Sequence, residues 1–405
     1  MTTFTAARVH RGDGGTPGSS FAVRDGVVVN VSDGPVVDLG DVDVLPGLVD
    51  LHADSLSRFE QPRPGVPVPL AHALESFAAD ALLAGVTTAL LCCSVEHATA
   101  PARSAEHAAA VLEAVAASDL PVDVRVHLRV DVTHDEAVAA AGRLVAAHPD
   151  RVALVSYMDH TPGRGQYSTV AAWRRAYRAL DRADDEVLDA RLAAFHAGAE
   201  GIGRRRAAVA ELANRAGVVV AAHDDETPEA VLEARRLGAR ISEFPVTERA
   251  AAAAIDAGLG VVVGAPNLWR GGSHGSGLSA RAAIAAGRAD VVASDYQLGS
   301  LLPGLRAAAT AGVAPFAELV ATVTRNPAEH VGLPDRGAPR TGSPCGLRRR
   351  ARGPCGRCLA RRPAAAVPRL TVSPAEDHRG QPRTTGVSRG PSARCRGRSS
   401  YRCLW

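Results

Sequence analysis

The chain has 405 residues, 46% hydrophobic and 22% charged, which suits one large domain or one large and one small domain. The net charge of +3 hides an asymmetry. Ala338 to Trp405 holds 16 Arg against only Glu376 and Asp377, which leaves about −11 for the preceding residues. An acidic body gives no support to a nucleic-acid partner, and the basic segment lacks the periodicity and aromatic residues of a binding module.

The sequence gives no sign of export or membrane insertion. Residues 1–30 lack a basic start followed by an apolar stretch, and no run of about 18 apolar residues occurs. Outside the tail, the cysteines are the adjacent pair Cys92 and Cys93 at the end of an apolar run, where buried thiols suit a reducing compartment. We expect a cytoplasmic protein with no membrane partner, and the sequence is compatible with a homo-oligomer.

Residues 1–45 predict part of a small β-sandwich domain. Short apolar runs at Phe21–Val23, Gly26–Val29 and Pro35–Val37 are separated by Gly and Asp, as is typical of strands and turns.

Residues 46–337 predict an α/β fold, a (β/α)8 TIM-like barrel, because short apolar runs alternate with Ala-rich helical stretches. The eight expected strands are Leu48–Asp54, Val86–Cys93, Asp123–Asp131, Val152–His160, Val218–Asp224, Ala239–Pro245, Gly260–Pro266 and Asp290–Asp295. The expected helices include His72–Leu83, Ala105–Ala117, Pro228–Leu237 and Thr247–Ala257. Ser168–Gly217 is expected to add two helices as an insertion on the rim.

Polar side chains end nearly every expected strand. They are His52 and Asp54, Asp131, His160, His223 and Asp224, Glu243, Asn267 and Asp295. All strand C-termini of a parallel barrel open on one face, where barrel enzymes place their chemistry. For any one residue a cap or a satisfied buried polar group is the simpler explanation, but separate accidents at seven strand ends explain the pattern poorly.

Two strand ends suggest metal ligands. His52 and Asp54 lie two residues apart on one side of an extended strand, so together they can chelate one divalent ion. His160 and His223 can hold a second ion if a carboxylate bridges the two. The chain has no lysine, so a carboxylated lysine cannot serve, and Asp131 is the better candidate.

Asp295 follows the last expected strand and is assigned two roles, as a metal ligand and as the general base that takes a proton from water. We expect two divalent ions, Zn, Mn or Fe, which would stabilise charge on the attacking and leaving oxygens.

Arginines beside glycine follow several strands, as suits a site that holds phosphate oxygens. The expected substrate-binding residues are Arg58, Arg63, Arg164, Asn267, Arg270 and His274. A single loop arginine is usually just solvated, whereas four on one rim favour an anionic substrate.

Longer stretches of the sequence carry a family resemblance. They are Pro46-Gly-Leu-Val-Asp-Leu-His-Ala-Asp54, Pro62-Arg-Pro-Gly65, His127-Leu-Arg129, Met158-Asp-His-Thr-Pro-Gly163, His223-Asp-Asp225, Ile241-Ser-Glu-Phe-Pro245, Gly264-Ala-Pro-Asn267, Arg270-Gly-Gly-Ser-His274, Ser294-Asp-Tyr296 and Thr324-Arg-Asn-Pro327. From about Val44 to Gly337 the chain resembles the amidohydrolase-superfamily diphosphatases of the carbon–phosphorus lyase pathway. The resemblance implies metal-dependent hydrolysis of α-D-ribose 1-methylphosphonate 5-triphosphate, a small phosphorylated ribose-phosphonate, to the 5-phosphate and pyrophosphate.

The chain departs from that family at three places. Ser55 stands where the family has Asn after His-Thr-Asp, and Asp131 stands where it has Glu, which is one methylene longer. After Gly337 the superfamily returns to the small β domain, whereas residues 338–405 become rich in Arg, Cys and Pro without periodicity. We expect a disordered tail and an incomplete small domain, and we hypothesise translation in a wrong reading frame.

Two alternatives stay open on the sequence alone. The metal ligands would also suit an amidohydrolase that cleaves a C–N bond in a cyclic amide or an N-acyl substrate, although the rim arginines argue against it. The chain can also be a catalytically impaired protein, or a binding module that acts through its basic tail.

Overall fold

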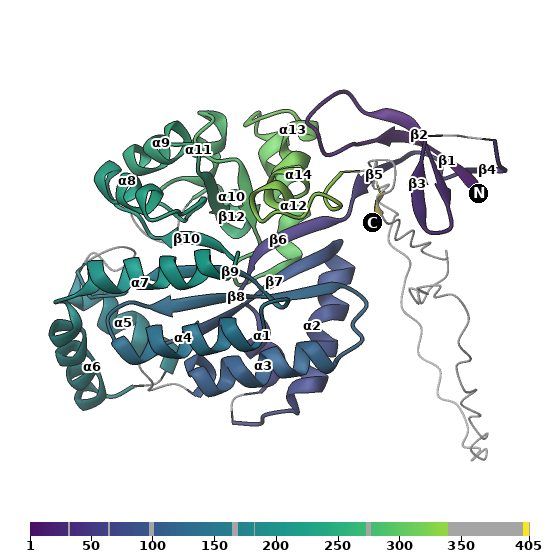
Figure 1. Cartoon of the computed structure of the whole chain (residues 1–405). Coiled ribbons are helices and arrows are strands. Elements are labelled where there is room, and N and C mark those ends of the chain that lie inside the picture. The colour runs from purple at the N-terminus through teal and green to yellow at the C-terminus, as the bar shows by residue number, and fades with distance from the viewer. Residues whose placement is uncertain are drawn as a thin grey trace, which may run out of the picture.

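An eight-stranded parallel barrel forms the centre of the molecule, as predicted (Figure 1). The computed structural model describes residues 1–30, 33–63, 65–96, 101–163, 169–181, 183–272, 277–338 and 400–404. Its barrel strands are β6 (Leu48–Ala53), β7 (Val86–Val95), β8 (Asp123–Asp131), β9 (Val152–Met158), β10 (Val219–His223), β11 (Ile241–Glu243), β12 (Gly260–Gly264) and β13 (Val291–Ala293). They pair in chain order, and a bridge between Ala53 and Asp295 joins the first strand to the end of the last.

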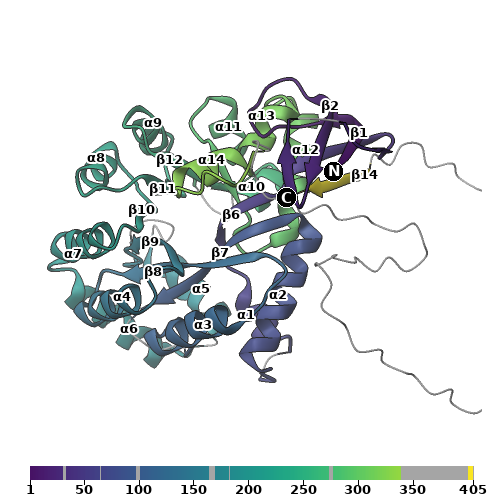
Figure 2. The ribbon, with the colours of Figure 1, turned by 45° about the vertical axis from the view of Figure 1, so that its right-hand side comes forward.

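Helices follow the strands and surround the barrel, a ring that Figure 2 shows. They are α1 (Leu56–Glu60), α2 (Leu70–Ala84), α3 (Ala105–Ala117), α4 (Asp135–Ala147), α7 (Ile202–Arg215), α8 (Pro228–Arg236), α9 (Glu248–Asp256), α10 (Ala265–Arg270), α11 (Ala280–Ala285), α12 (Leu301–Thr310), α13 (Phe316–Ala321) and α14 (Arg325–His330). Ser104, Thr227 and Thr247 each accept a backbone N–H with their hydroxyl at a helix start. No helix in the described part of the chain is long and apolar enough to span a bilayer.

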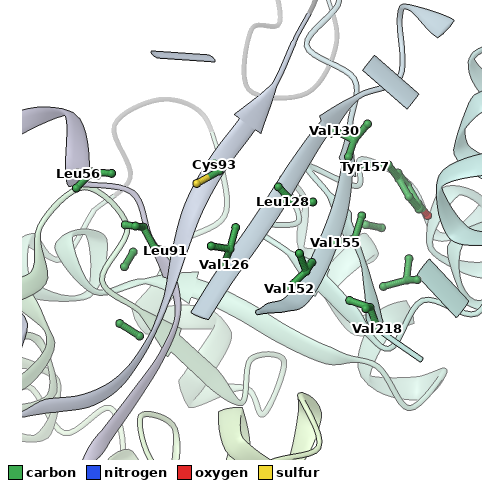
Figure 3. Close-up of a cluster of buried hydrophobic side chains, with 14 of the residues drawn as sticks. Leu56, Leu91, Cys93, Val126, Leu128, Val130, Val152, Val155, Tyr157 and Val218 are labelled. Carbon is green, nitrogen blue, oxygen red and sulfur yellow. The ribbon is translucent and has the colours of Figure 1, made fainter. Parts of the chain in front are cut away.

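Two apolar layers hold the barrel together. The outer layer packs strands against helices and includes Leu91, Val126, Leu128 and Val155, which Figure 3 shows along β7 to β9. The inner layer fills the barrel. Its members are Val49, Leu51, Leu90, Leu154, Ala221, Ile241, Val262, Val291, Ala293, Ala328, Val331 and Leu333. Since α14 and the residues after it supply the last three, this segment plugs the N-terminal end of the barrel and leaves the C-terminal mouth open for chemistry.

The rim insertion holds one helix more than the two we predicted. The segment contains α5 (Val170–Asp181), α6 (Asp185–Gly198) and α7. Trp173 is fully buried in a small separate cluster with Tyr177 and Leu188, so α5 and α6 have a core of their own. The missed boundary lies near Gly201, which adopts a left-handed φ of 89° directly before α7.

The first 46 residues form one mixed sheet. Its strands are β1 (Thr2–Val9), β2 (Gly18–Arg24), β3 (Val27–Val29), β4 (Val36–Asp38) and β5 (Val42–Pro46). The long β1 pairs with β2 on one side and with β4 and β5 on the other. From the tail, β14 (Ser400–Leu404) pairs in parallel with β5 and adds a strand that we did not expect. The disorder expected for the tail otherwise falls outside the described residues, and so do Arg164 and His274.

Candidate metal centre

Three predicted metal ligands meet at the C-terminal mouth of the barrel. His52 is the last residue but one of β6, His223 ends β10, and His160 follows β9. The ring centroids of His52 and His223 lie 5.8 Å apart, and those of His160 and His223 lie 5.9 Å apart. Because β6 and β10 are four strands apart in the sheet order, closure of the barrel is what brings these rings together.

A local irregularity in β6 directs His52 into the mouth. Strict alternation would turn His52 away from the interior, because its neighbour Leu51 packs in the inner layer. The β6–β7 register shifts between Asp50 and Ala53, and a shift of this kind re-aims a side chain. Asp50 stabilises the irregular backbone, since its Oδ1 accepts the N–H groups of His52 at 3.2 Å and Ser294 at 3.0 Å.

His160, His223 and Asp224 form one set of donor atoms that lie within 4.8 Å of one another. Asp224 lies 3.2 Å from His223 Nδ1 and 4.0 Å from His160 Nε2. Two buried atoms of this set, His160 Nε2 and Asp224 Oδ2, have no hydrogen-bond partner among the described residues, and His223 Nδ1 has only the neighbouring Asp224 carboxylate. Buried polar atoms are rarely left unsatisfied, so these residues fit a divalent cation that bonds to all three.

A second set consists of His52, His223 and Glu243. Glu243 is fully buried at the end of β11, and its Oε1 lies 3.0 Å from His52 Nδ1. The contact favours a proton on Nδ1 and a free lone pair on the other ring nitrogen of His52. We had noted Glu243 and Asp224 only as polar strand ends, and neither was among the predicted ligands.

The protonation states of two of the three histidines suit metal binding. Burial lowers the pKa of His160 to about 4, and burial together with Arg129 lowers the pKa of His52 well below its usual value. Both rings are therefore neutral near pH 7, the form that coordinates a metal. At His223 burial also opposes the charge, but Asp224 overcomes it and raises the pKa.

The remaining predicted carboxylate ligands have other partners. Asp54 Oδ2 accepts a hydrogen bond of 2.9 Å from Nη1 of Arg129. Asp131 Oδ1 accepts from the N–H and the hydroxyl of Thr133 at 2.8 and 2.6 Å. Neither carboxylate belongs to a metal-donor set among the described residues, so their assignment as ligands stays a prediction.

Asp295 lies just beyond β13, where its backbone pairs with Ala53 at the end of β6. Its carboxylate Oδ2 lies beside Gly264, where the Asn267 amide also approaches. Burial raises the pKa of Asp295 to about 6, and Asp54 adds to the effect, so the carboxyl can exchange a proton near neutral pH. Asp224, Phe244 and Asp295 all have positive φ values, of 59°, 52° and 57°. Backbone strain of this kind gathers at functional sites.

The described arginines predicted to bind substrate are exposed on the rim. Nη1 of Arg58 donates to the Tyr296 carbonyl at 3.3 Å and to Gln297 Oε1 at 2.8 Å, which links α1 to the segment after β13. Arg270 donates to Asn267 Oδ1 at 2.9 Å. Arg63 lies in a turn that its bridge with Val66 closes.

Cys92, His127 and His52 form a third donor set. Burial raises the pKa of the Cys92 thiol, which keeps it protonated and a poor ligand. Nδ1 of His127 lies 3.1 Å from the Leu51 carbonyl and its Nε2 lies 2.8 Å from the Ser156 hydroxyl, so both ring nitrogens have partners. We assign this set a structural role.

Comparison with known proteins agrees with this geometry. No protein-family model matches the chain. It is 32% identical over 305 residues to the α-D-ribose 1-methylphosphonate 5-triphosphate diphosphatase of Escherichia coli (strain K12), across 73% of this chain and 79% of that protein. The chain belongs to this diphosphatase family. The resemblance inferred from the motifs is thereby confirmed.

Solved structures of other hydrolases share the fold. N-acetyl-D-glucosamine-6-phosphate deacetylase from Mycobacterium smegmatis matches with a TM-score of 0.55 at 17% identity, over 85% of this chain and 94% of that chain. Guanine deaminase from C. acetobutylicum matches with a TM-score of 0.53 at 11% identity, over 85% and 89%. At these identities the likeness concerns the fold alone.

Proposed function

We propose that the protein hydrolyses α-D-ribose 1-methylphosphonate 5-triphosphate to the 5-phosphate and pyrophosphate, in phosphonate catabolism. The observation that carries the proposal is the 32% identity to the E. coli diphosphatase of that name. The buried His160, His223 and Asp224 donor set supports it, since diphosphate hydrolysis needs a strong centre of positive charge.

A bound divalent ion, Zn, Mn or Fe, would polarise phosphoryl oxygens and lower the pKa of water. His160, His223 and Asp224 would hold it. Arg58, Arg63 and Arg270, with Arg164 from outside the described residues, would bind the outer phosphates at the rim. Asn267 would orient the substrate beside Asp295, and His274, which lies outside the described residues, is proposed to take part in binding.

Asp295 would take a proton from a water molecule. The water oxygen would then add to one of the two phosphorus atoms that the oxygen between the first and second phosphates joins. The bond from that phosphorus to the bridging oxygen breaks, and its electron pair stays on the bridging oxygen. The products are the 5-phosphate and pyrophosphate, and the protons of the water pass to Asp295 and then to solvent.

A direct assay tests the proposal. Protein purified without chelator is incubated with the ribose 5-triphosphate, and pyrophosphate and phosphate are measured separately. Pyrophosphate release supports the proposal. Release of phosphate alone, or no release, would contradict it. Cyclic amides and N-acyl amino acids serve as parallel substrates, because ammonia or amine release would favour a C–N hydrolase instead.

A further inference from the structure

A buried arginine lies inside the candidate metal centre. Arg129 is only 9% exposed. Its Nη1 donates to Asp54 Oδ2 at 2.9 Å, and its Nη2 lies 3.3 Å from Nε2 of His223. Its Nε has no hydrogen-bond partner among the described residues. A permanent cation thus stands next to the histidine that both mouth donor sets share.

His223 limits how many ions the centre can hold. The His160 and His52 donor sets both require it. A neutral imidazole has one nitrogen with a free lone pair, because the other carries the proton. One ring therefore completes one of the two sets at a time.

Two of the carboxylates predicted as metal ligands are already engaged. Asp54 is paired with Arg129, and Asp131 accepts two hydrogen bonds from Thr133. The chain has no lysine to carboxylate as a bridge. Two ions would also add four positive charges beside the Arg129 guanidinium, whose charge is permanent.

We propose that the centre works with a single divalent ion and that the Arg129 guanidinium supplies the second positive charge at the reacting phosphates. The proposal rests on the proposed function and replaces the two ions expected from the sequence. Asp54 holds one edge of the guanidinium. An ion held by Nδ1 of His223 would leave the ring proton on Nε2, so Nη2 of Arg129, 3.3 Å away, would be free to donate to a phosphate oxygen. A fixed cation of this kind stabilises the charge that develops on phosphate oxygens during hydrolysis.

Metal stoichiometry tests the first half without any substrate. Protein saturated with Mn²⁺ and freed of excess ion is analysed by inductively coupled plasma mass spectrometry, calorimetric titration and electron paramagnetic resonance. We expect one Mn²⁺ per chain with the six-line spectrum of an isolated ion. Two ions per chain with an exchange-coupled spectrum would overturn the proposal, as would the absence of any bound ion.

Arg129→Met and Arg129→Lys test the second half. The Asp54 side chain is 47% exposed, so water can solvate it when the guanidinium is removed, and both variants should fold. Arg129→Met should keep its ion but bind inorganic pyrophosphate about tenfold to a hundredfold more weakly than the wild type. Its turnover of the ribose 5-triphosphate should fall by about 100-fold or more. Arg129→Lys should recover part of both losses, which a merely structural role would not produce.

Arg215→Gln is the matched control, because the side chain is 78% exposed and pairs only with Glu211 among the described residues. Pyrophosphate affinity of Arg129→Met equal to that of the control would overturn the role of Arg129. If the wild type binds one ion and pyrophosphate but releases none from the ribose 5-triphosphate, the proposed substrate is wrong while the assignment of the centre stands.

Discussion

Thr133, two residues after Asp131, donates two hydrogen bonds to the Asp131 carboxylate. Its hydroxyl lies 2.6 Å and its N–H 2.8 Å from the same oxygen. His134 adds a further contact of 3.7 Å to the other oxygen. Burial opposes ionisation of Asp131, but these partners hold its pKa below the usual value. The carboxylate expected to bridge two metal ions is therefore committed to the turn that follows β8.

Asp131→Asn should leave the metal content unchanged. The amide oxygen can still accept from Thr133, so we expect only a modest loss of stability, about 1 kcal/mol. Metal analysis and thermal unfolding of the purified variant check this. Loss of metal from Asp131→Asn would instead establish Asp131 as a ligand, and Asp131→Glu, the residue that the family resemblance implies at this position, should then bind metal more tightly.

Removing the ion should destabilise the protein and abolish turnover. A ligand at about 100 times its Kd stabilises the folded state by about 3 kcal/mol, and a chelator removes that contribution. Denaturant unfolding of chelated and reloaded protein measures the difference, and activity should return with the metal.

His160→Ala and Asp224→Ala should behave like the stripped protein and gain nothing from added metal. His72→Gln is the control, because this side chain is 65% exposed on α2. If both site variants retained wild-type metal content, the donor set would be assigned wrongly.

The barrel was predictable from the sequence because its strands are nearly continuous apolar runs, and the bounds of β8 and α3 match the prediction. The rim insertion was harder. α6 ends at Gly198 and α7 begins at Ile202, so the break between them is short and depends on the backbone conformation of Gly201. The sequence likewise placed His52, His160 and His223 at strand ends. Because a closed barrel brings its strand ends together at one mouth, the proximity of the three side chains follows.

The partners of those histidines could not be predicted in the same way. Glu243 and Asp224 also lie at strand ends, but whether such a residue is a ligand or a capping group depends on where its side chain points, which the sequence does not give. The positive φ of Asp224 and the register shift in β6 set those directions. Arg129 was visible only as part of a motif, because nothing in its sequence neighbours indicates that it turns inward to Asp54.

Asp295→Asn should slow turnover by about 10² to 10⁴-fold, the usual contribution of a general base. The amide is nearly the same size but cannot accept a proton from water. The His160, His223 and Asp224 set is intact in this variant, so it should still bind metal. Steady-state kinetics and metal analysis on the same preparation provide the test. Turnover close to wild type would remove Asp295 from the role of base, and loss of metal with loss of turnover would make it a ligand.

Asp43 should make the junction between the small sheet and the barrel sensitive to acid. Asp43 is 2% exposed, and Arg8 and His10 both contact its carboxylate, with His10 Nε2 at 3.2 Å. The His10 ring packs edge-on against Phe316 of α13, at 5.4 Å between centroids, which links this cluster to the barrel. Burial alone would raise the pKa of Asp43, but hydrogen bonds from His10 and Arg8 lower it to about 2.

A carboxyl whose pKa is depressed in the folded state stabilises the protein above its unfolded pKa and loses that contribution as the pH falls toward the folded pKa. Asp43→Asn should therefore lower the free energy of unfolding by about 1 to 2 kcal/mol at pH 7. The difference in unfolding free energy between the variant and the wild type should narrow between pH 4 and about pH 2. Asp33→Asn is the control, since Asp33 is 69% exposed and lies 4.0 Å from Arg24. Denaturant unfolding across this pH range measures the gap, and a gap independent of pH would show that Asp43 acts through packing rather than charge.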